Sequence, residues 1–242
     1  MNISNYIAAQ IDRLPRGYVF TYTDFMSKVN KKEAIIKALN RMAASGKIIK
    51  LAKGKFYKPE TTSFGNLQPS LNQIVKDILE NNGKIIGYLT GYSIYNTLGL
   101  TTQVSNMIQI GKNEMRPSFK RGLYTISFIK QKNTITKDNI PLLQILDSIR
   151  YIKKIPGTSN GDAGKRLLVI ISKLNQNEIN TLIRLSLKYP PSTRALTGAL
   201  LEKSGMAEVT KQLRRSLNPI TTYKIPDILK DISSAQNWNI KE

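Results

Sequence analysis

The first stretch of the chain with a clear chemical bias is KIIKLAKGKFYKP, from Lys47 to Pro59. It holds five lysines and no acidic residue, and apolar residues separate the charges. Cations at this density are suited to contact with an anion, above all the phosphates of a nucleic-acid backbone. The solvated face of an ordinary hairpin has the same composition, so the surrounding elements must decide between the two interpretations.

The whole chain shares this bias. Its 242 residues include 37 Lys and Arg against 16 Asp and Glu, which gives a formal net charge of +21. Such an excess draws polyanions to a protein and accelerates their association with it. A lysine-rich genome is the plain alternative explanation.

Histidine and cysteine are both absent. This removes the commonest general base, the thiol nucleophile and the usual transition-metal ligands. The carboxylates are scattered rather than paired, and GTSNGDAGK at residues 157–165 lacks the Gly and Ser/Thr positions of a P-loop. We therefore expect no catalytic residue, no metal site and no cofactor, and we interpret the chain as a binding protein rather than an enzyme.

Nothing in the sequence indicates a membrane. No apolar run reaches the roughly 18 residues that a spanning helix needs, and the amphipathic start with its early Asp12 does not follow the pattern of a signal peptide. Mean hydropathy is −0.28, and the absence of cysteine removes any disulfide framework. We expect a cytoplasmic protein without a membrane partner.

The elements predicted around the lysine-rich stretch suggest what it does. Apolar residues at helical spacing predict a first helix that ends at Pro15. Thr21 and Asp24 form the T-x-x-D pattern of a capping box, which predicts the start of a second helix. A third helix ends at Gly46, a residue suited to a left-handed C-cap. The predicted order is helix, short strand, helix, helix and hairpin, at residues 3–14, 18–20, 21–29, 32–45 and 47–59.

This order is that of a winged helix-turn-helix, whose second motif helix enters the major groove of DNA. At about 100° per residue, the third helix turns Ile35 and Leu39 inward, with Met42 and Ala43, and leaves its polar residues and Ala44 outside. Arg can read guanine and Asn can read adenine, while lysines of the hairpin lie where phosphates or a minor groove pass. The predicted DNA-binding residues are Lys31, Lys32, Lys37, Asn40, Arg41, Lys50, Lys53 and Lys55.

The rest of the chain predicts a mixed α/β domain that is largely helical. PETTSFGNLQPS, residues 59–70, has neither a helical nor a strand period and is interpreted as a linker. NMIQIG and GLYTISFIK have the composition of strands, and helical patterns prevail from Ile140 onward. We expect an α+β protein with a winged helix-turn-helix domain at residues 1–60, an α/β domain at residues 71–205 and a helical extension or tail at residues 206–242.

Five strings of the chain resemble those of a known family: LPRGYVFTYTDF, KALNRMAASGKIIKLAKGKFYKP, GYLTGYSIYNTLGL, NIPLLQILDSIRYIKKIP and YPPSTRALTGALLE. The strings of the first domain are common among regulators, whereas those of the second domain are more distinctive. Together they give a layout that resembles the AbiEi-type antitoxins of type IV (AbiE) toxin–antitoxin systems over residues 1–205.

The resemblance implies a function for each domain. The first would repress the chain's own operon by binding double-stranded DNA at inverted repeats of the promoter. The second would neutralise a nucleotidyltransferase toxin encoded beside it, with direct contact between the two proteins left open. No single antitoxin residue carries over. The chain is expected to be a monomer alone, and whether it pairs on DNA is left open.

Three other interpretations compete with this one. An RNA-binding or ribosome-associated protein would use the same charge, but such proteins usually display exposed aromatic residues on a sheet or a recognised loop motif, and the sequence shows neither. A plain winged-helix transcriptional regulator would lack the antitoxin role. An enzyme held on nucleic acid by the winged helix would need the general bases or carboxylate pairs that the sequence lacks.

Overall fold

The computed structural model describes residues 2–242 and is an α+β protein. It divides into two compact units, and the boundary follows Ile78 rather than falling within residues 59–70. The first unit also includes five residues from much later in the chain. The units comprise residues up to Ile78 with Lys120–Tyr124, and Leu79–Phe119 with Thr125–Glu242.

The first unit opens with two α-helices and a small antiparallel sheet of strand order β1-β3-β2. The structure differs from the second helix expected at residues 21–29, which is a 3-10 turn of four residues. Its capping box forms as expected, because the Asp24 carboxylate accepts a hydrogen bond of 2.8 Å from the Thr21 N–H. The elements are α1 (Ile3–Arg13), β1 (Val19–Phe20), η1 (Tyr22–Phe25), α2 (Lys32–Ala44), β2 (Ile49–Ala52) and β3 (Lys55–Tyr57).

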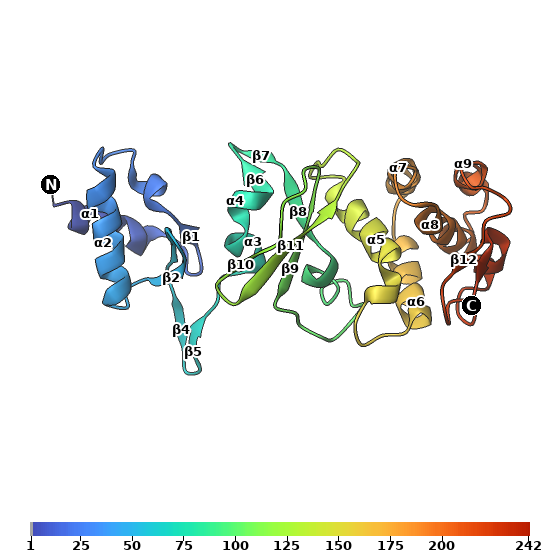
Figure 1. Cartoon of the computed structure of the whole chain (residues 1–242), viewed down its shortest axis with the longest axis horizontal. Helices are drawn as coiled ribbons and strands as arrows, with labels where there is room; N and C mark the ends of the chain where they lie inside the picture. The colour runs from blue at the N-terminus through green and yellow to red at the C-terminus, as the bar shows by residue number, and fades with distance from the viewer. Residues whose placement is uncertain (1) are drawn as a thin grey trace. The chain divides into compact units, whose positions relative to one another are not determined.

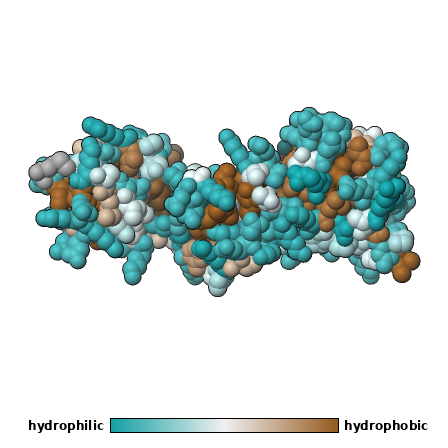
Figure 2. All heavy atoms as spheres, turned by 90° about the horizontal axis from the view of Figure 1, so that it is seen from above, coloured by the Kyte–Doolittle hydropathy of each residue, from teal (hydrophilic) through white to brown (hydrophobic). Residues whose placement is uncertain are grey.

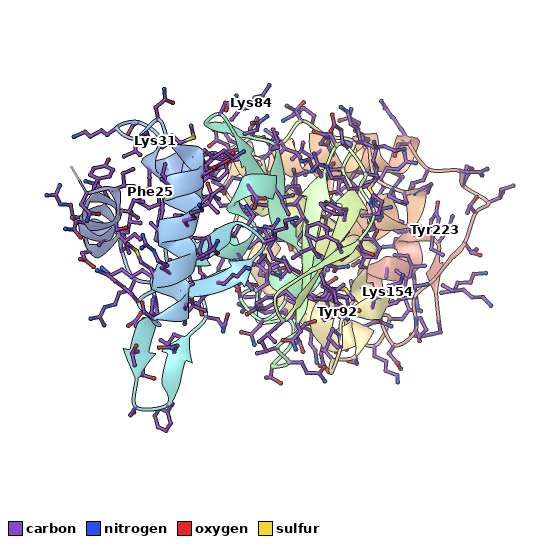
Figure 3. The ribbon with its side chains drawn as sticks, turned by 60° about the vertical axis from the view of Figure 1, so that its left-hand side comes forward. Phe25, Lys31, Lys84, Tyr92, Lys154 and Tyr223 are labelled. Carbon is purple, nitrogen blue, oxygen red and sulfur yellow. The ribbon has the colours of Figure 1, made fainter. Side chains whose placement is uncertain are left out.

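An apolar core joins these elements. Phe25 lies between α1 and α2 (Figure 3), and its ring meets that of Phe20 edge to face at 5.6 Å. Gly46 follows α2 with a φ of 76°, the left-handed conformation predicted for its end. The buried members of this core include Ile7, Ile11, Phe20, Phe25, Ile35, Ala38, Leu39, Ile48 and Phe56.

Residues 59–70, expected as a linker, form a second hairpin of β4 (Glu60–Thr62) and β5 (Gly65–Leu67). Figure 3 shows it projecting past the end of α2 that lies opposite Lys31. Its strands of three residues are too short to show an alternating period, which explains why the sequence pattern missed it. Two short helices, α3 (Leu71–Ile74) and α4 (Lys76–Leu79), follow it.

A four-stranded mixed sheet has the order β10-β11-β9-β8. Strand β11 pairs with β9 in parallel, and β8 pairs with β9 in antiparallel register. The two longest strands are those predicted from NMIQIG and GLYTISFIK. A two-stranded hairpin precedes the sheet, and a 3-10 turn follows β8 directly. The elements are β6 (Glu80–Asn81), β7 (Lys84–Ile85), β8 (Gly87–Thr90), η2 (Gly91–Ser93), β9 (Met107–Lys112), β10 (Phe119–Arg121) and β11 (Tyr124–Lys130).

Helices gather beside this sheet within the second unit (Figure 1). Asn175 and Glu178 form a reciprocal capping box at the start of one of them, as their spacing predicts. The apolar residues of α5, α6, α7 and α8 fill a core that is larger than the one between α1 and α2. The helices are α5 (Ile140–Arg150), η3 (Ile152–Lys154), α6 (Asn160–Ile171), α7 (Gln176–Ser186) and α8 (Pro191–Lys203).

Residues 206–242, expected as an extension or tail, belong to this second core. Trp238 is 2% exposed, and its ring lies so close to Gly198 of α8 that a Cβ there would overlap it. The indole N–H donates to the Glu202 carboxylate at 2.8 Å. The elements of this segment are η4 (Glu208–Thr210), α9 (Lys211–Arg215), β12 (Tyr223–Lys224), η5 (Ser233–Trp238) and β13 (Ile240–Lys241).

The face shown in Figure 2 is mostly hydrophilic, with apolar residues in separate small groups. Among residues 2–242, no helix combines the length and the apolar character that crossing a membrane requires.

Candidate nucleic-acid interface

Helix α2 has the outward face that its sequence predicts. Lys37, Asn40, Arg41 and Ala44 are exposed, whereas Ile35, Ala38 and Leu39 are buried. Met42 and Ala43 are half-buried against the same core. The one buried position that the prediction missed is Ala38. A small residue at the end of the outward face keeps the helix slim enough to approach a groove.

Two further cations stand at the N-terminal end of α2. Lys31 occupies the N-cap position, and Figure 3 shows it at this end of the helix. Lys32 follows, with its ammonium 4.9 Å from the centre of the Tyr22 ring. Both lysines are exposed. Their charges add to the positive end of the helix dipole, so this end of α2 favours an anion.

Arg41 already has a partner. Its Nη2 donates a hydrogen bond of 2.7 Å to the Ser4 hydroxyl on α1. This contact ties the guanidinium to α1 and uses one of its five N–H donors, which leaves the others for a further partner. The sequence pattern could not reveal it, because the two residues are 37 positions apart.

The five lysines of the opening stretch divide into two groups. Lys50 and Lys53 are exposed on the β2–β3 hairpin, on either side of its buried Leu51. Lys47 instead pairs with Asp12 at 3.1 Å, and Lys58 donates to carbonyl groups at the end of α1. A lysine at that position stabilises the last turn of a helix.

Lys55, predicted to contact DNA, points into the first unit instead. Its ammonium lies 3.1 Å from the Asp77 carboxylate, and its side chain is 19% exposed. Arg121 binds the same carboxylate with two hydrogen bonds of 2.6 and 3.1 Å and also donates to the Ile74 carbonyl at 2.7 Å. Residues 120–124 and α4 therefore hold the β2–β3 hairpin, which the sequence could not show because the partners are distant along the chain.

This arrangement changes the acidity of Asp77. Burial alone would raise the pKa of its carboxyl group, but the hydrogen bond and charge of Arg121, with the charge of Lys55, more than offset burial. The net result is a pKa below the ordinary value for aspartate. Asp77 is therefore a carboxylate whose role is to fix two cations within the unit.

The second unit contains a buried polar cluster that the sequence analysis missed. Asp147 on α5 is 0% exposed. Its carboxylate accepts hydrogen bonds from the hydroxyls of Tyr88 (2.7 Å), Thr90 (2.8 Å) and Tyr189 (2.9 Å). The Gln131 amide donates to both phenolic oxygens at 2.8 Å. We call these five residues the Asp147 cluster.

Two tyrosines of this unit, Tyr88 and Tyr95, are buried and offer no ring face on which a base could stack. Tyr88 and Tyr95 are each 2% exposed. Burial raises the pKa of both phenols and also that of Asp147, whose hydrogen bonds only partly offset the loss of water. The signal missed in the sequence was a lone Asp in the apolar helix IPLLQILDSIR.

Comparisons with known proteins are consistent with this fold and are silent on activity. A family model described as "Family of unknown function (DUF6088)" matches residues 6–201. No curated protein matches the chain. The crystal structure of the Rv2827c protein from Mycobacterium tuberculosis is similar, with a TM-score of 0.59 and 15% identity over 93% of this chain and 84% of that chain. At this identity the similarity shows a shared fold and no more.

Proposed function

The chain belongs to the DUF6088 family of unknown function, and we propose that this member is a DNA-binding antitoxin. Its first unit is a winged helix-turn-helix that binds double-stranded DNA and represses the chain's own operon. Its second unit neutralises a nucleotidyltransferase toxin. The observation that carries the DNA-binding half is the outward face of α2, where Lys37, Asn40 and Arg41 are exposed and which ends at the small residue Ala44.

The winged-helix assignment is supported by the order of the elements. Helices α1 and α2, with η1 between them, pack on a three-stranded sheet whose last hairpin follows α2 directly. In such a motif α2 enters the major groove, and the β2–β3 hairpin is the wing. Asn40 and Arg41 then face bases, and the exposed lysines of α2 and the wing face phosphates.

Lys55 is not part of this surface in our proposal. It is the residue by which the wing is fastened to Asp77, so its effect on DNA is indirect. The phosphate contacts then come from the exposed cations of α2 and the wing, namely Lys31, Lys32, Lys37, Lys50 and Lys53.

The proposed antitoxin role of the second unit is supported by three of the strings that resemble those of AbiEi-type antitoxins. Tyr88 and Thr90 come from GYLTGYSIYNTLGL, Asp147 from NIPLLQILDSIRYIKKIP, and Tyr189 from YPPSTRALTGALLE. These three strings, far apart in sequence, meet in the Asp147 cluster. The resemblance therefore concerns residues that shape the interior of one unit rather than unrelated segments.

A salt titration tests DNA binding. Fluorescence anisotropy would follow the full chain on a duplex from its own upstream region and on a random duplex. Five phosphate contacts predict a slope of log K against log salt of about −4 to −5. A slope near zero would show that the net charge of the chain has no role in binding DNA.

Variants of α2 test where bases are read. Asn40→Ala with Arg41→Ala should lose about 1–3 kcal/mol of discrimination between the two duplexes for each lost bidentate contact. Arg13→Ala removes the same charge from the exposed surface of α1 and should leave discrimination unchanged. If Arg13→Ala had the same effect, α2 would not be the reading helix.

Co-expression with the neighbouring nucleotidyltransferase tests the antitoxin half. The Asn40→Ala and Arg41→Ala double variant should lose repression of a promoter reporter but still protect cells from the toxin. Loss of protection together with repression would mean that the chain acts only as a regulator.

A further inference from the structure

The second unit has a cationic cavity that the proposed function leaves unused. Its volume is about 240 Å³, and four cations line it, namely Lys130, Lys132, Arg150 and Lys188. No acidic side chain is among its lining residues. The remaining walls include Gln131 and Tyr189, two members of the Asp147 cluster.

The cations come from three separate segments. Lys130 and Lys132 lie at and just after the end of β11, Arg150 ends α5, and Lys188 lies between α7 and α8. Arg150 is held in place by stacking on the Tyr151 ring, with its guanidinium carbon 5.0 Å from the ring centre. Lys132 and Lys188 are exposed. The Lys130 ammonium donates to the Asn113 carbonyl, and bringing the other three like charges to one cavity is unfavourable unless an anion offsets their repulsion.

The Asp147 cluster fixes the floor of this cavity. The Gln131 amide donates to the Tyr189 hydroxyl at 2.8 Å, and that hydroxyl donates to Asp147 at 2.9 Å. Because Gln131 lies between two of the cations and Tyr189 follows a third, these bonds tie the cation-bearing segments together. A buried carboxylate is costly and does not by itself stabilise a fold. Here it positions residues around a hollow, which is what a preorganised binding site requires.

Size and charge select the ligand. Pockets for drug-sized molecules usually exceed about 300 Å³, so this cavity suits something smaller. Arg and Lys bind phosphate oxygens through charge-assisted hydrogen bonds. The cavity also meets the start of α8 at Pro190 and Pro191, where the helix dipole adds positive potential. We propose that this cavity binds a small anion carrying one or two phosphate groups.

Calorimetric titration of the full chain with pyrophosphate, at constant ionic strength, tests the proposal. Pyrophosphate should bind, and Lys132→Gln with Lys188→Gln should weaken its binding about tenfold through the loss of charge-assisted hydrogen bonds. The matched control is Lys137→Gln with Lys173→Gln, two exposed lysines elsewhere in this unit. This control should stay within about twofold of the unaltered chain. No binding, or equal weakening by both pairs, would overturn the proposal.

A second arm separates a free anion from a nucleic-acid phosphate. The same variants are titrated with a short random duplex in place of pyrophosphate. The cavity double variant and the control double variant should bind the duplex with equal affinity, because each of them removes two positive charges. If the loss of Lys132 and Lys188 weakened duplex binding but not pyrophosphate binding, the cavity would be part of a surface for polyanions. That result would refute the small-anion site. The α2 variants remain a separate test of DNA binding by the first unit.

Discussion

Asp77 and Asp147 are the central carboxylates of the two units, and their surroundings differ in kind. Asp77 keeps 43% of its side-chain surface and holds two cations, Lys55 and Arg121. Asp147 is 0% exposed and accepts its hydrogen bonds from the neutral hydroxyls of Tyr88, Thr90 and Tyr189. The first carboxyl group has a lowered pKa and the second a raised one.

The difference shows two ways in which a very basic chain uses its few acids. Near the surface, an acid neutralises cations that would otherwise repel each other, and water weakens the attraction. In the interior, an acid has no cationic hydrogen-bond partner. It instead accepts hydrogen bonds from hydroxyl groups of segments that are far apart in the sequence, and so holds these segments together. Ion pairs therefore fasten the β2–β3 hairpin, whereas neutral hydrogen bonds organise the core of the second unit.

Removal of the buried carboxylate should have the largest effect. Asp147→Ala leaves three buried hydroxyls without their acceptor and should lower the free energy of unfolding of the second unit by about 3–5 kcal/mol. Urea denaturation followed by tryptophan fluorescence measures it, because Trp238 belongs to that core. Asp138→Ala, the same change at an exposed position, should cost less than about 0.5 kcal/mol. Equal losses of stability in the two variants would show that the Asp147 cluster contributes no more to folding than an exposed carboxylate does.

Neutralising the other carboxylate should have a smaller effect. Asp77→Asn removes the charge with which Asp77 pairs Arg121, whose side chain is 9% exposed, and should cost the first unit about 1–3 kcal/mol. Amide hydrogen exchange over residues 49–57 reports this loss locally. Asp12→Asn breaks an ion pair whose side chains are 39% and 59% exposed, and should cost about 0–1 kcal/mol.

Acid should act on the two units differently. Because the pKa of Asp77 is lowered, its stabilising contribution is present above the unfolded value of about 3.9 and is lost as pH falls below it. The pKa of Asp147 is raised, so its ionisation opposes folding as pH rises above about 3.9, and protonation does not weaken its unit. Amide hydrogen exchange, corrected for the pH dependence of the intrinsic exchange rate, should therefore accelerate more in residues 49–57 than in residues 140–150 as the pH falls from 5 to 3. Asp77→Asn should remove that difference.

Two neighbouring lysines should show the smallest and most selective effects. Lys53→Ala should weaken binding to all duplexes alike and reduce the salt slope by about 1, as expected for a phosphate contact. Lys55→Ala should leave the slope unchanged and instead lower the stability of the first unit by about 0.5–1 kcal/mol. Identical slopes for the two variants would contradict the different roles given to these lysines.

Local signals in the sequence predicted local structure well. Thr21 with Asp24, and Asn175 with Glu178, mark the starts of elements because a cap requires only residues three positions apart. Helix α2 was predicted with its outward face, since helical spacing alone sets which residues share a side. The same reasoning failed at residues 21–29, where a cap begins a turn but does not determine its length.

Features that depend on distant residues were not predictable from pattern. In the sequence, Lys55 has the same character as the other lysines of its hairpin, and only its contacts with Asp77 and the neighbouring Arg121 distinguish it. The three hydroxyl groups that donate to Asp147 belong to residues 42 to 59 positions away from it. The end of the first unit at Ile78 depends likewise on the contacts of Arg121. In each case a side chain's role is set by tertiary contacts that composition and periodicity do not encode.

The packing of Trp238 against Gly198 has a consequence for protein synthesis. Trp238 covers a surface of α8 that is translated about 40 residues earlier, so at about 5–20 residues per second this surface stays uncovered for several seconds. During this interval, apolar side chains of the second unit lie open to chaperones and to other nascent chains. A ribosome that stalls in this window releases a product whose core cannot close, and quality-control proteases would recognise it by that exposed surface.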